Sequence, residues 1–249
     1  MSAQFVHLRL HSEYSLVDGL VRLKPLAAKA AELRMPAIAL TDFNNFFGLV
    51  KFYKAVQGAG VKPILGSDVL IADESGEGSP SQLVLLISNN TGYKNLTTLI
   101  SRGYQEGQRQ GIPTIRLSWL EELNEGLIAL SGGRLGEIGI SLISGRRADA
   151  ETSLKRLMAI FPDRFYLELQ RTGRPDEEDY LHAAVDLADV FSLKNLFQVC
   201  LDKDSKTKNT SRAIVTDVLS QHGVYSGSTQ LIIRFYKINA VNPGYLLMV

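Results

Sequence analysis

A histidine-rich stretch near the amino terminus has the spacing of a metal site but carries an arginine at one of the ligand positions. Residues 7–11 read HLRLH, and Asp18 follows seven residues later. Alternate side chains of a β-strand point to the same side, so Arg9 and His11 share one face, where a His-x-His pair could hold a metal ion. A guanidinium group has donors and no lone pair, and therefore cannot ligate a cation.

The elements that must position these groups are short apolar runs alternating with helix-length segments, which is typical of βα units. In the first run, residues 5–10, the apolar residues Val6, Leu8 and Leu10 share one face. This pattern predicts a barrel strand that packs outward on helices and turns its polar residues inward. Further strands are expected at 36–40, 64–71, 82–87, 126–130 and 165–169, and helices at 23–35, 46–57, 91–104, 118–124, 148–161 and 176–189. The predicted fold class is α/β.

Composition sets looser limits. A chain of 249 residues with 45% apolar residues predicts one domain with a sizeable core. The net charge of +1 gives no reason to infer a strongly basic nucleic-acid surface, and the single Cys200 excludes an internal disulfide and an all-cysteine zinc site. We find no leader-like segment at the start and no apolar run that could span a bilayer, so we expect a soluble cytoplasmic protein without a membrane partner.

The chain also carries several motifs in a fixed order. They are HSEYS at 11–15 with DG at 18–19, ALTDF at 39–43 with GL at 48–49, KPILG at 62–66, NTGYKNL at 90–96, LSGGR at 130–134 and YLELQRTGRP at 166–175. Together they resemble the PHP (polymerase and histidinol phosphatase) domain at the amino terminus of bacterial DNA polymerase III alpha subunits, from about residue 5 to residue 188. The resemblance implies a (β/α)7 barrel whose metal-binding members hydrolyse phosphoesters.

The resemblance also allows the family's ligand positions to be checked one by one. Positions that hold ligands in metal-binding members carry other residue types here, namely Arg9, Phe43, Gln82 and Gly133. The candidate ligands that remain, as a vestigial metal site, are His11, Asp18, Asp42 and Asp68. Asp68 stands in place of a family glutamate. The family's last motif, an Asp-x-His after the seventh strand, has no counterpart.

Arg9 is better interpreted as a replacement for the metal than as a neighbour of it. A fixed positive charge about 4 Å from a divalent ion costs on the order of 8 kcal/mol at an effective dielectric constant near 20. We therefore expect Arg9 to make charge-assisted hydrogen bonds with Asp18 or Asp68, and we expect no cofactor. Under the alternative interpretation, Zn, Mn or Mg binds and the chain is a phosphoesterase or a 3'-5' exonuclease.

The glycine-rich turn Ser131, Gly132, Gly133 and Arg134 is a weaker candidate, for phosphate binding. Its position between a strand and a helix could turn backbone N–H groups toward a phosphate. A simple tight turn is the favoured alternative, because the loop lacks the Lys and Ser/Thr of a P-loop.

Beyond about Val190 the alternation of strands and helices ends. We expect a PHP domain over residues 1–189 and a poorly ordered, unrelated tail over 190–249, from a frameshift or a chimeric gene model. Within this tail only residues 231–236 resemble a strand, so the barrel is expected to be incomplete because its last strand is replaced.

Three functions are compatible with these observations. The first is a structural and interaction module that contacts the rest of the alpha subunit and the proofreading exonuclease subunit, and meets DNA only within the holoenzyme. The second is the metal-dependent enzyme, and the third is a free-standing phosphate-binding barrel. The lost ligand types favour the first. The family is a DNA-directed DNA polymerase, a nucleotidyltransferase, but its polymerase parts lie downstream, so we do not expect this chain to polymerise DNA alone.

Overall fold

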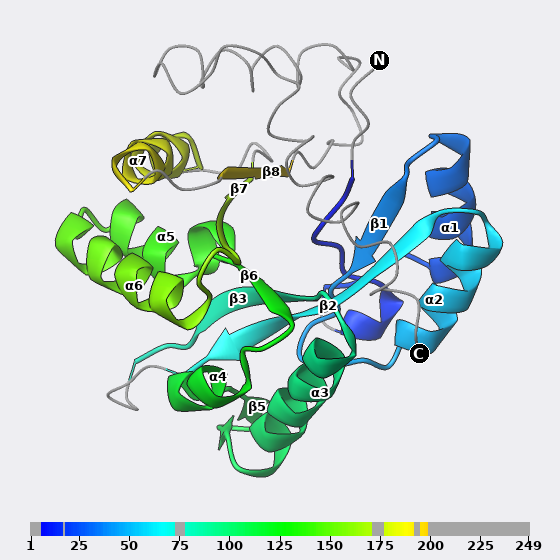
Figure 1. Cartoon of the computed structure of the whole chain (residues 1–249), viewed down its shortest axis with the longest axis horizontal. Coiled ribbons are helices and arrows are strands. Elements are labelled where there is room, and N and C mark those ends of the chain that lie inside the picture. Colours follow the sequence, from blue (N-terminus) through cyan, green and yellow to red (C-terminus); the bar gives the residue numbers. More distant parts are fainter. Residues whose placement is uncertain (1–5, 17, 73–77, 171–176, 192–194, 199–249) are drawn as a thin grey trace.

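A curved, mixed sheet forms the centre of the molecule (Figure 1). The computed structural model describes residues 6–16, 18–72, 78–170, 177–191 and 195–198, the last four as backbone only. The sheet order is β1 (Ala37–Leu40), β2 (Lys62–Ile71), β3 (Ser81–Ile87), β6 (Leu127–Leu130), β7 (Phe165–Gln170) and β8 (Asn195–Gln198). A separate hairpin joins β4 (Gln108–Arg109) to β5 (Ile112–Pro113). The incomplete α/β barrel predicted from the sequence is confirmed.

The sheet contains both parallel and antiparallel pairs. β1 and β2 are parallel, as are β6, β7 and β8, whereas β3 is antiparallel to both β2 and β6. The β2–β3 connection, residues 72–80, is shorter than the roughly dozen residues that a parallel crossover needs. Close pairing here requires a glycine, because a Cβ added to Gly66 would lie 2.4 Å from the carbonyl oxygen of Leu85.

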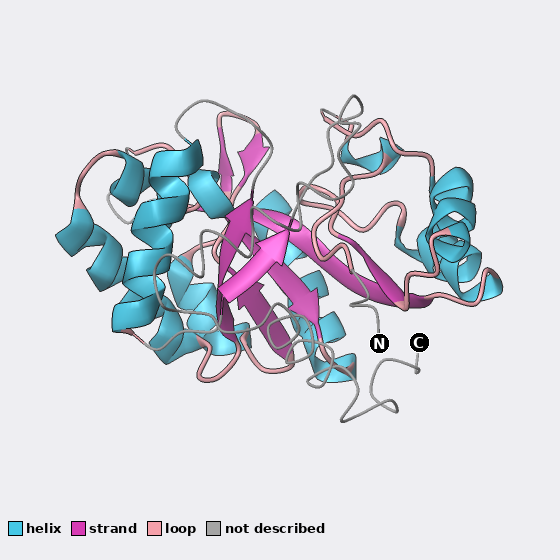
Figure 2. Cartoon of the chain, turned by 90° about the horizontal axis from the view of Figure 1, so that it is seen from above, coloured by secondary structure: helices cyan, strands magenta, loops and turns pink. Residues whose placement is uncertain are grey.

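Helices cover the outer face of the sheet, as the view from above shows (Figure 2). They are α1 (Leu23–Glu32), α2 (Leu49–Gly58), α3 (Asn90–Gln105), α4 (Leu117–Leu123), α5 (Glu137–Ile143), α6 (Arg147–Ile160) and α7 (Glu177–Val190), with 3-10 turns η1 (Glu13–Ser15) and η2 (Gly133–Leu135). α3 begins where Asn89 accepts a hydrogen bond from the Gly92 N–H at 2.9 Å, as an N-cap. α5 and the β4–β5 hairpin were not predicted from the sequence pattern.

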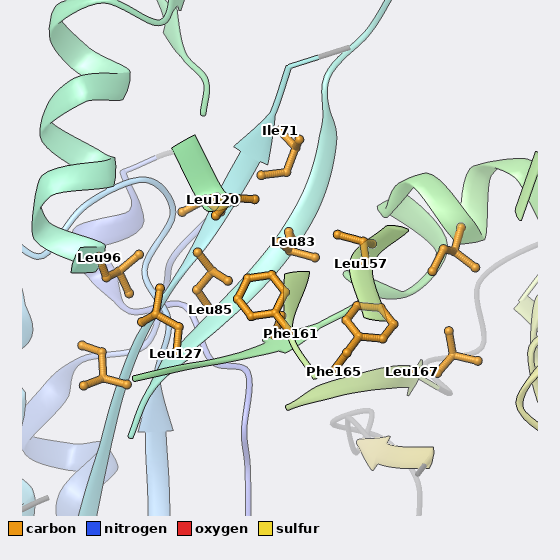
Figure 3. Packing of buried hydrophobic residues seen from close by; sticks show 14 of the residues in the cluster. Ile71, Leu83, Leu85, Leu96, Leu120, Leu127, Leu157, Phe161, Phe165 and Leu167 are labelled. Atoms are coloured by element: carbon orange, nitrogen blue, oxygen red, sulfur yellow. The ribbon is translucent and has the colours of Figure 1, made fainter. Parts of the chain in front are cut away.

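Two apolar layers lie on opposite faces of the sheet. On the outer face, Leu83 and Leu85 of β3 pack with Leu157 of α6 and with Phe161, which directly follows α6 (Figure 3). The inner layer, here called the barrel floor, consists of Leu8, Ala37, Ala39, Ile64, Val84, Leu86, Ile128, Leu130 and Tyr166. Strand alternation assigns odd residues of β3 to the outer layer and even residues to the floor. Polar groups on the inner face therefore lie above an apolar base.

The predicted orientation of the first strand is wrong for Val6 and Leu8. Leu8 belongs to the floor, and Val6 packs against it rather than outward on helices. The Ala39 N–H donates to the His7 carbonyl and the Thr41 N–H to the Leu10 carbonyl. The two acceptors are three residues apart in the first segment, residues 6–10, whereas the two donors are two residues apart at β1 and its end. The first segment therefore holds one extra residue, as in a β-bulge. That extra residue turns both Leu8 and Arg9 inward.

Of the predicted tail, residues 190–249, the structure describes residues 190–191 and 195–198. β8 lies in this region and pairs in parallel with β7, with Leu167 opposite Asn195. A strand at this position was not predicted from the sequence pattern. The remainder of the predicted tail, including the candidate strand 231–236, lies outside the described residues. Within the described part of the chain, no helix combines the length and apolar character needed to cross a membrane.

Candidate functional site at the barrel mouth

Arg9 occupies the centre of a polar cluster above the floor. Its Nε donates to Asp68 Oδ2 at 2.9 Å, and its Nη2 donates to the same oxygen and to Gln82 Oε1 at 2.5 Å. Its Nη1 donates to the carbonyl oxygen of Gly132 and to Glu168 Oε1, both at 3.3 Å. All five guanidinium N–H groups therefore have an acceptor, so Arg9 links the first segment to β2, β3 and β7.

Strand register explains why these groups converge. Asp68 of β2 faces Val84 of β3, and Leu70 faces Gln82. Asp68 is on the same face as the floor residue Ile64, and Glu168 is on the same face as Tyr166, because each lies an even number of residues away. The acceptors thus form a layer directly above the floor, at the carboxyl ends of β2 and β7.

The cluster is almost completely buried. The Arg9 side chain is 10% exposed, and those of Asp68 and Glu168 are 0% exposed. Burial lowers the pKa of Arg9, but the charges of Glu168 and Asp68 and their hydrogen bonds outweigh it, so the net shift is upward. Arg9 is therefore a permanent cation between two buried carboxylates. Asp68 Oδ1 has no hydrogen-bond partner among the described residues, because the contacts converge on Oδ2.

His11 extends the cluster toward solvent. Its Nδ1 lies 2.8 Å from Asp18 Oδ2, and its Nε2 lies 3.1 Å from Asp68 Oδ2. Burial lowers the pKa of His11, but the hydrogen bonds and charges of Asp68, followed by those of Asp18, raise it above the ordinary value of 6.5. The Phe43 ring lies against this imidazole with a centroid distance of 6.3 Å. The two carboxylates therefore stabilise the protonated imidazole relative to a free histidine.

Asp42 has a different role from the other candidate ligands. Its Oδ1 accepts hydrogen bonds from the Ser12 N–H at 2.6 Å and from Ser15 Oγ at 3.2 Å, and its Oδ2 accepts one from Ser12 Oγ at 2.8 Å. The Ser15 hydroxyl oxygen in turn accepts a hydrogen bond from the Phe43 N–H. Asp42 thus holds the η1 turn against the end of β1 and does not join the Arg9 cluster.

The metal ion that the resemblance implies does not fit these residues. The Arg9 guanidinium lies between the two buried carboxylates that could act as ligands, and both nitrogens of His11 already face carboxylate oxygens. Among the described residues, no group of three or more His, Cys, Asp or Glu side chains is placed to hold a metal ion. A divalent cation would also face the fixed charge of Arg9. We therefore derive no metal-dependent step at this site.

Glu168 belongs to the cluster but was not among the candidates from sequence. Its Oε1 also accepts a hydrogen bond from Gln170 Nε2 at 2.5 Å, and its carbonyl oxygen accepts one from the Tyr180 hydroxyl of α7 at 2.5 Å. A signal was present, since alternation places Glu168 on the inner face of a strand that is otherwise apolar near it. A carboxylate at such a position requires a partner.

The glycine-rich turn uses its polar groups within the fold. The Ser131 N–H donates to the carbonyl oxygen of Tyr166 at 3.0 Å, and Ser131 Oγ accepts a hydrogen bond from the Glu168 N–H at 2.9 Å. Gly132 has a positive φ of 75°, and a Cβ there would lie 2.3 Å from the Gln82 carbonyl oxygen. These contacts favour the tight-turn alternative, and phosphate binding at Ser131–Arg134 stays a prediction.

An incomplete α/β barrel with its polar groups gathered at the strand ends is the class of domain that these features define. Residues 7–172 match the PHP domain family model, and the chain belongs to this family. Over 189 residues, 76% of its length, it is 56% identical to DNA polymerase III subunit alpha of Pseudomonas fluorescens. Over 190 residues it is 54% identical to the same subunit of Escherichia coli K12. It spans 16% of the length of either relative, and it corresponds to their amino-terminal PHP region.

The fold also resembles a solved structure of low sequence identity. A Bifidobacterium adolescentis protein, provisionally described as a metal-dependent phosphoesterase, superposes with a TM-score of 0.52 at 11% identity. The match covers 88% of this chain and 96% of that protein. At this identity the likeness shows the fold alone.

Proposed function

We propose that this chain serves as the PHP module of DNA polymerase III, acting as a structural and interaction platform and not as a hydrolase. The observation that carries this proposal is the guanidinium of Arg9, which binds the buried carboxylates of Asp68 and Glu168 at the position where a metal-binding barrel needs an open site. In this function Arg9 holds strands of the barrel together by hydrogen bonds and charge.

The partners proposed for this platform are the rest of the alpha subunit and the proofreading exonuclease subunit. The support is the high identity to alpha subunits over most of the chain. DNA would be met only in the assembled polymerase, since nucleotidyl transfer needs carboxylates that hold two metal ions against a nucleotide. We assign that chemistry to the parts of the alpha subunit outside the matched region.

A metal-dependent phosphoesterase or 3'-5' exonuclease is the second candidate. Its support is the barrel likeness to the protein described as a metal-dependent phosphoesterase, together with the proximity of His11, Asp18 and Asp68. Zn, Mn or Mg would be the metal. Against it stands the unfavourable interaction between any such ion and the buried charge of Arg9.

Metal analysis combined with a phosphoesterase assay distinguishes the two candidates. The full chain is purified, incubated with Zn or Mn and dialysed, and an established metal-dependent phosphoesterase is treated in parallel as a positive control. We expect metal far below one ion per chain and no turnover of a chromogenic phosphoester. Stoichiometric metal with turnover that disappears in His11→Ala would contradict the platform function. A separate capture experiment with the exonuclease subunit tests the proposed partner.

A further inference from the structure

The charges of this chain are unevenly distributed, although its net charge is only +1. Residues 20–60 contain six Lys or Arg residues, all exposed, and two carboxylates, of which Asp42 is buried against Ser12. At the other end of the sheet order, α7 has no Lys or Arg and carries four exposed carboxylates, Glu178, Asp179, Asp186 and Asp189. Such a charge asymmetry indicates a charged partner, and the net charge of the whole chain conceals it.

The six cations belong to two helices that pack side by side (Figure 1). α1 connects the first segment to β1, and α2 connects β1 to β2; these three segments run parallel, so the two helices run in the same direction. Their buried side chains, among them Ala27 and Phe52, belong to one apolar core. We call the exposed cations of these helices and their ends the α1–α2 face; they are Arg22, Lys24, Lys29, Arg34, Lys51 and Lys54. A helix of this length extends over about 15 Å, and packed helix axes lie about 8–10 Å apart, so the cations form one compact patch.

Ion pairs within the chain do not neutralise this face. Lys29 lies 2.8 Å from Glu32 in an exposed pair. Lys51 donates to the neutral Tyr14 hydroxyl at 2.6 Å, with the Glu13 carboxylate as a more distant neighbour. Within the part of the chain that the structure describes, the other four cations of the face have no carboxylate partner. Most of its positive charge is therefore available to a partner.

Helix stability also does not explain the cations at the amino ends of the two helices. Arg22 is the N-cap of α1, Lys24 lies in its first turn, and Lys51 lies in the first turn of α2. The helix dipole favours carboxylates at such positions and disfavours cations, and neither first turn contains an acidic residue. Only Lys29 and Arg34, toward the carboxyl end of α1, have signs that the dipole favours. The cations at the amino ends thus oppose local stability, which points to a role in binding.

We propose that the α1–α2 face binds the phosphate backbone of duplex DNA without sequence preference. Duplex DNA carries one negative charge per about 1.7 Å of its axis, so a duplex lying on α1 and α2 presents phosphates to every cation of the face. Contacts from Lys and Arg to phosphates position the duplex and do not read its bases. The proposal rests on the platform function: in the assembled polymerase the face holds the duplex, and in the isolated chain the same contact gives weak, salt-sensitive binding. The acidic α7 lies away from this face (Figure 1) and does not oppose the contact.

The test measures binding of the full chain to a labelled, mixed-sequence DNA duplex by fluorescence anisotropy, from about 50 to 200 mM salt. Lys24→Gln/Lys54→Gln removes two cations of the face, and Lys24→Glu/Lys54→Glu reverses them. The matched control for the reversal is Arg147→Glu/Lys155→Glu on α6, which changes the net charge equally but lies away from the α1–α2 face (Figure 1). Circular dichroism confirms that each variant is folded, and the neutral variant serves if the reversal disturbs the helices.

We expect wild type to bind two duplexes of unrelated sequence equally, with the logarithm of the association constant falling linearly with the logarithm of the salt concentration. Each lost phosphate contact reduces the magnitude of this slope by about 0.9, so Lys24→Gln/Lys54→Gln should reduce it by about 1.8. Both variants of the face should bind about tenfold or more weakly at low salt. The control on α6 should bind as wild type does.

Four other outcomes would contradict parts of this account. Undetectable binding by wild type at about 50 mM salt, or equal weakening in the α6 control, would exclude the face as a DNA site and leave the platform function intact. Tighter binding of poly-glutamate than of the duplex, lost in Lys24→Gln/Lys54→Gln, would overturn the proposal in favour of an acidic protein. Salt-sensitive self-association lost in the same variant would overturn it in favour of a second copy that offers its acidic α7. Metal-dependent turnover in the phosphoesterase assay would reject the platform function while DNA binding by this face persists.

Discussion

At the scale of single residues, Arg9 is a buried cation whose donors are all used and whose neighbours carry the opposite charge. A buried ion pair of this kind adds little to the free energy of unfolding compared with well-packed apolar side chains. Removing only one of its partners, however, is strongly destabilising. Removal of the guanidinium leaves the buried Glu168 without its cation and leaves the buried Asp68 with His11 as its remaining basic neighbour. The position is therefore far less tolerant than an exposed arginine.

The change Arg9→Met is expected to lower the free energy of unfolding by about 3 to 5 kcal/mol, because it removes the cation that binds two buried carboxylates. Urea denaturation of the full chain measures it. Arg147→Met, which removes an exposed ion pair with Glu151 on α6, is the matched control and should cost less than about 1 kcal/mol. Equal losses in the two variants would contradict the structural role of Arg9.

A double-mutant cycle isolates the contact between Arg9 and Asp68. Arg9→Met and Asp68→Asn are measured singly and together by the same method. Side chains in direct contact couple by roughly 0.5 to 3 kcal/mol, so the effects should not add. Additive effects would mean that the two charges do not stabilise each other.

His11 predicts a pH dependence of stability with a definite sign. Its folded-state pKa lies above the ordinary value of 6.5 because Asp68 and Asp18 outweigh the effect of burial. The stabilisation is therefore fully present below pH 6.5 and is lost as the pH rises through the folded-state pKa. Unfolding free energies of wild type and His11→Gln, measured from about pH 5.5 upward, should converge as the pH increases. A difference that grows with pH would contradict this assignment.

Residue types alone predicted part of this cluster. Arg9 cannot bind a metal, and of its two expected partners, Asp18 and Asp68, it is Asp68 that lies against it, whereas Asp18 contacts His11. Glu168 was missed because no ligand position was considered within the motif that contains it. Alternation along the strand nevertheless places Glu168 on the same inner face as Tyr166. The role of Asp42 could not be predicted, because it depends on how the chain turns at Ser12 and Ser15.

At the scale of elements, regular periodicity predicted most of the helices and the inner strands well. The prediction for the first segment failed because one extra residue opposite β1 reverses the orientation of Val6 and Leu8. No periodicity reports such a bulge, since it is created by the pairing of two distant segments. The short helix α5 and the two-residue strands of the hairpin lack enough turns or alternations to give a pattern.

Gly66→Ala tests the close approach of β2 and β3. The new methyl group would lie 2.4 Å from a backbone oxygen of β3, which cannot move without displacing the ladder, so we expect a loss of about 1 to 3 kcal/mol. Gly58→Ala in α2 is the matched control, because nothing lies within 4 Å of its added Cβ and alanine favours the helix. Thermal or urea unfolding of both variants measures the contrast. A stabilised Gly66→Ala variant would mean that the strands are less tightly paired.

At the scale of the whole molecule, the apolar floor and the Arg9 cluster divide the barrel interior into two layers. The floor excludes water from below, which strengthens the charged contacts above it. Arg9 belongs to the first segment, whereas Glu168 belongs to β7, and these lie near opposite ends of the sheet order. The guanidinium therefore connects parts of the barrel that the backbone ladder joins only through several intervening strands.

Hydrogen exchange should report this connection. In Arg9→Met, exchange at the Thr41 and Glu168 amides is expected to increase more than exchange at Leu99 in α3, because the first segment loses its side-chain link to β7. Exchange followed by NMR under native conditions separates such local opening from global unfolding. A uniform increase at all three positions would show that Arg9 acts on overall stability without linking these two regions.

The fixed charge also has a consequence for how the barrel is completed after synthesis. A barrel that relies on bound ions must acquire them after synthesis, and its occupancy then depends on supply and on competing chelators. The guanidinium of Arg9 is delivered with the chain itself and is always protonated in proteins. Neither metal starvation nor chelation can therefore remove this cation from the barrel.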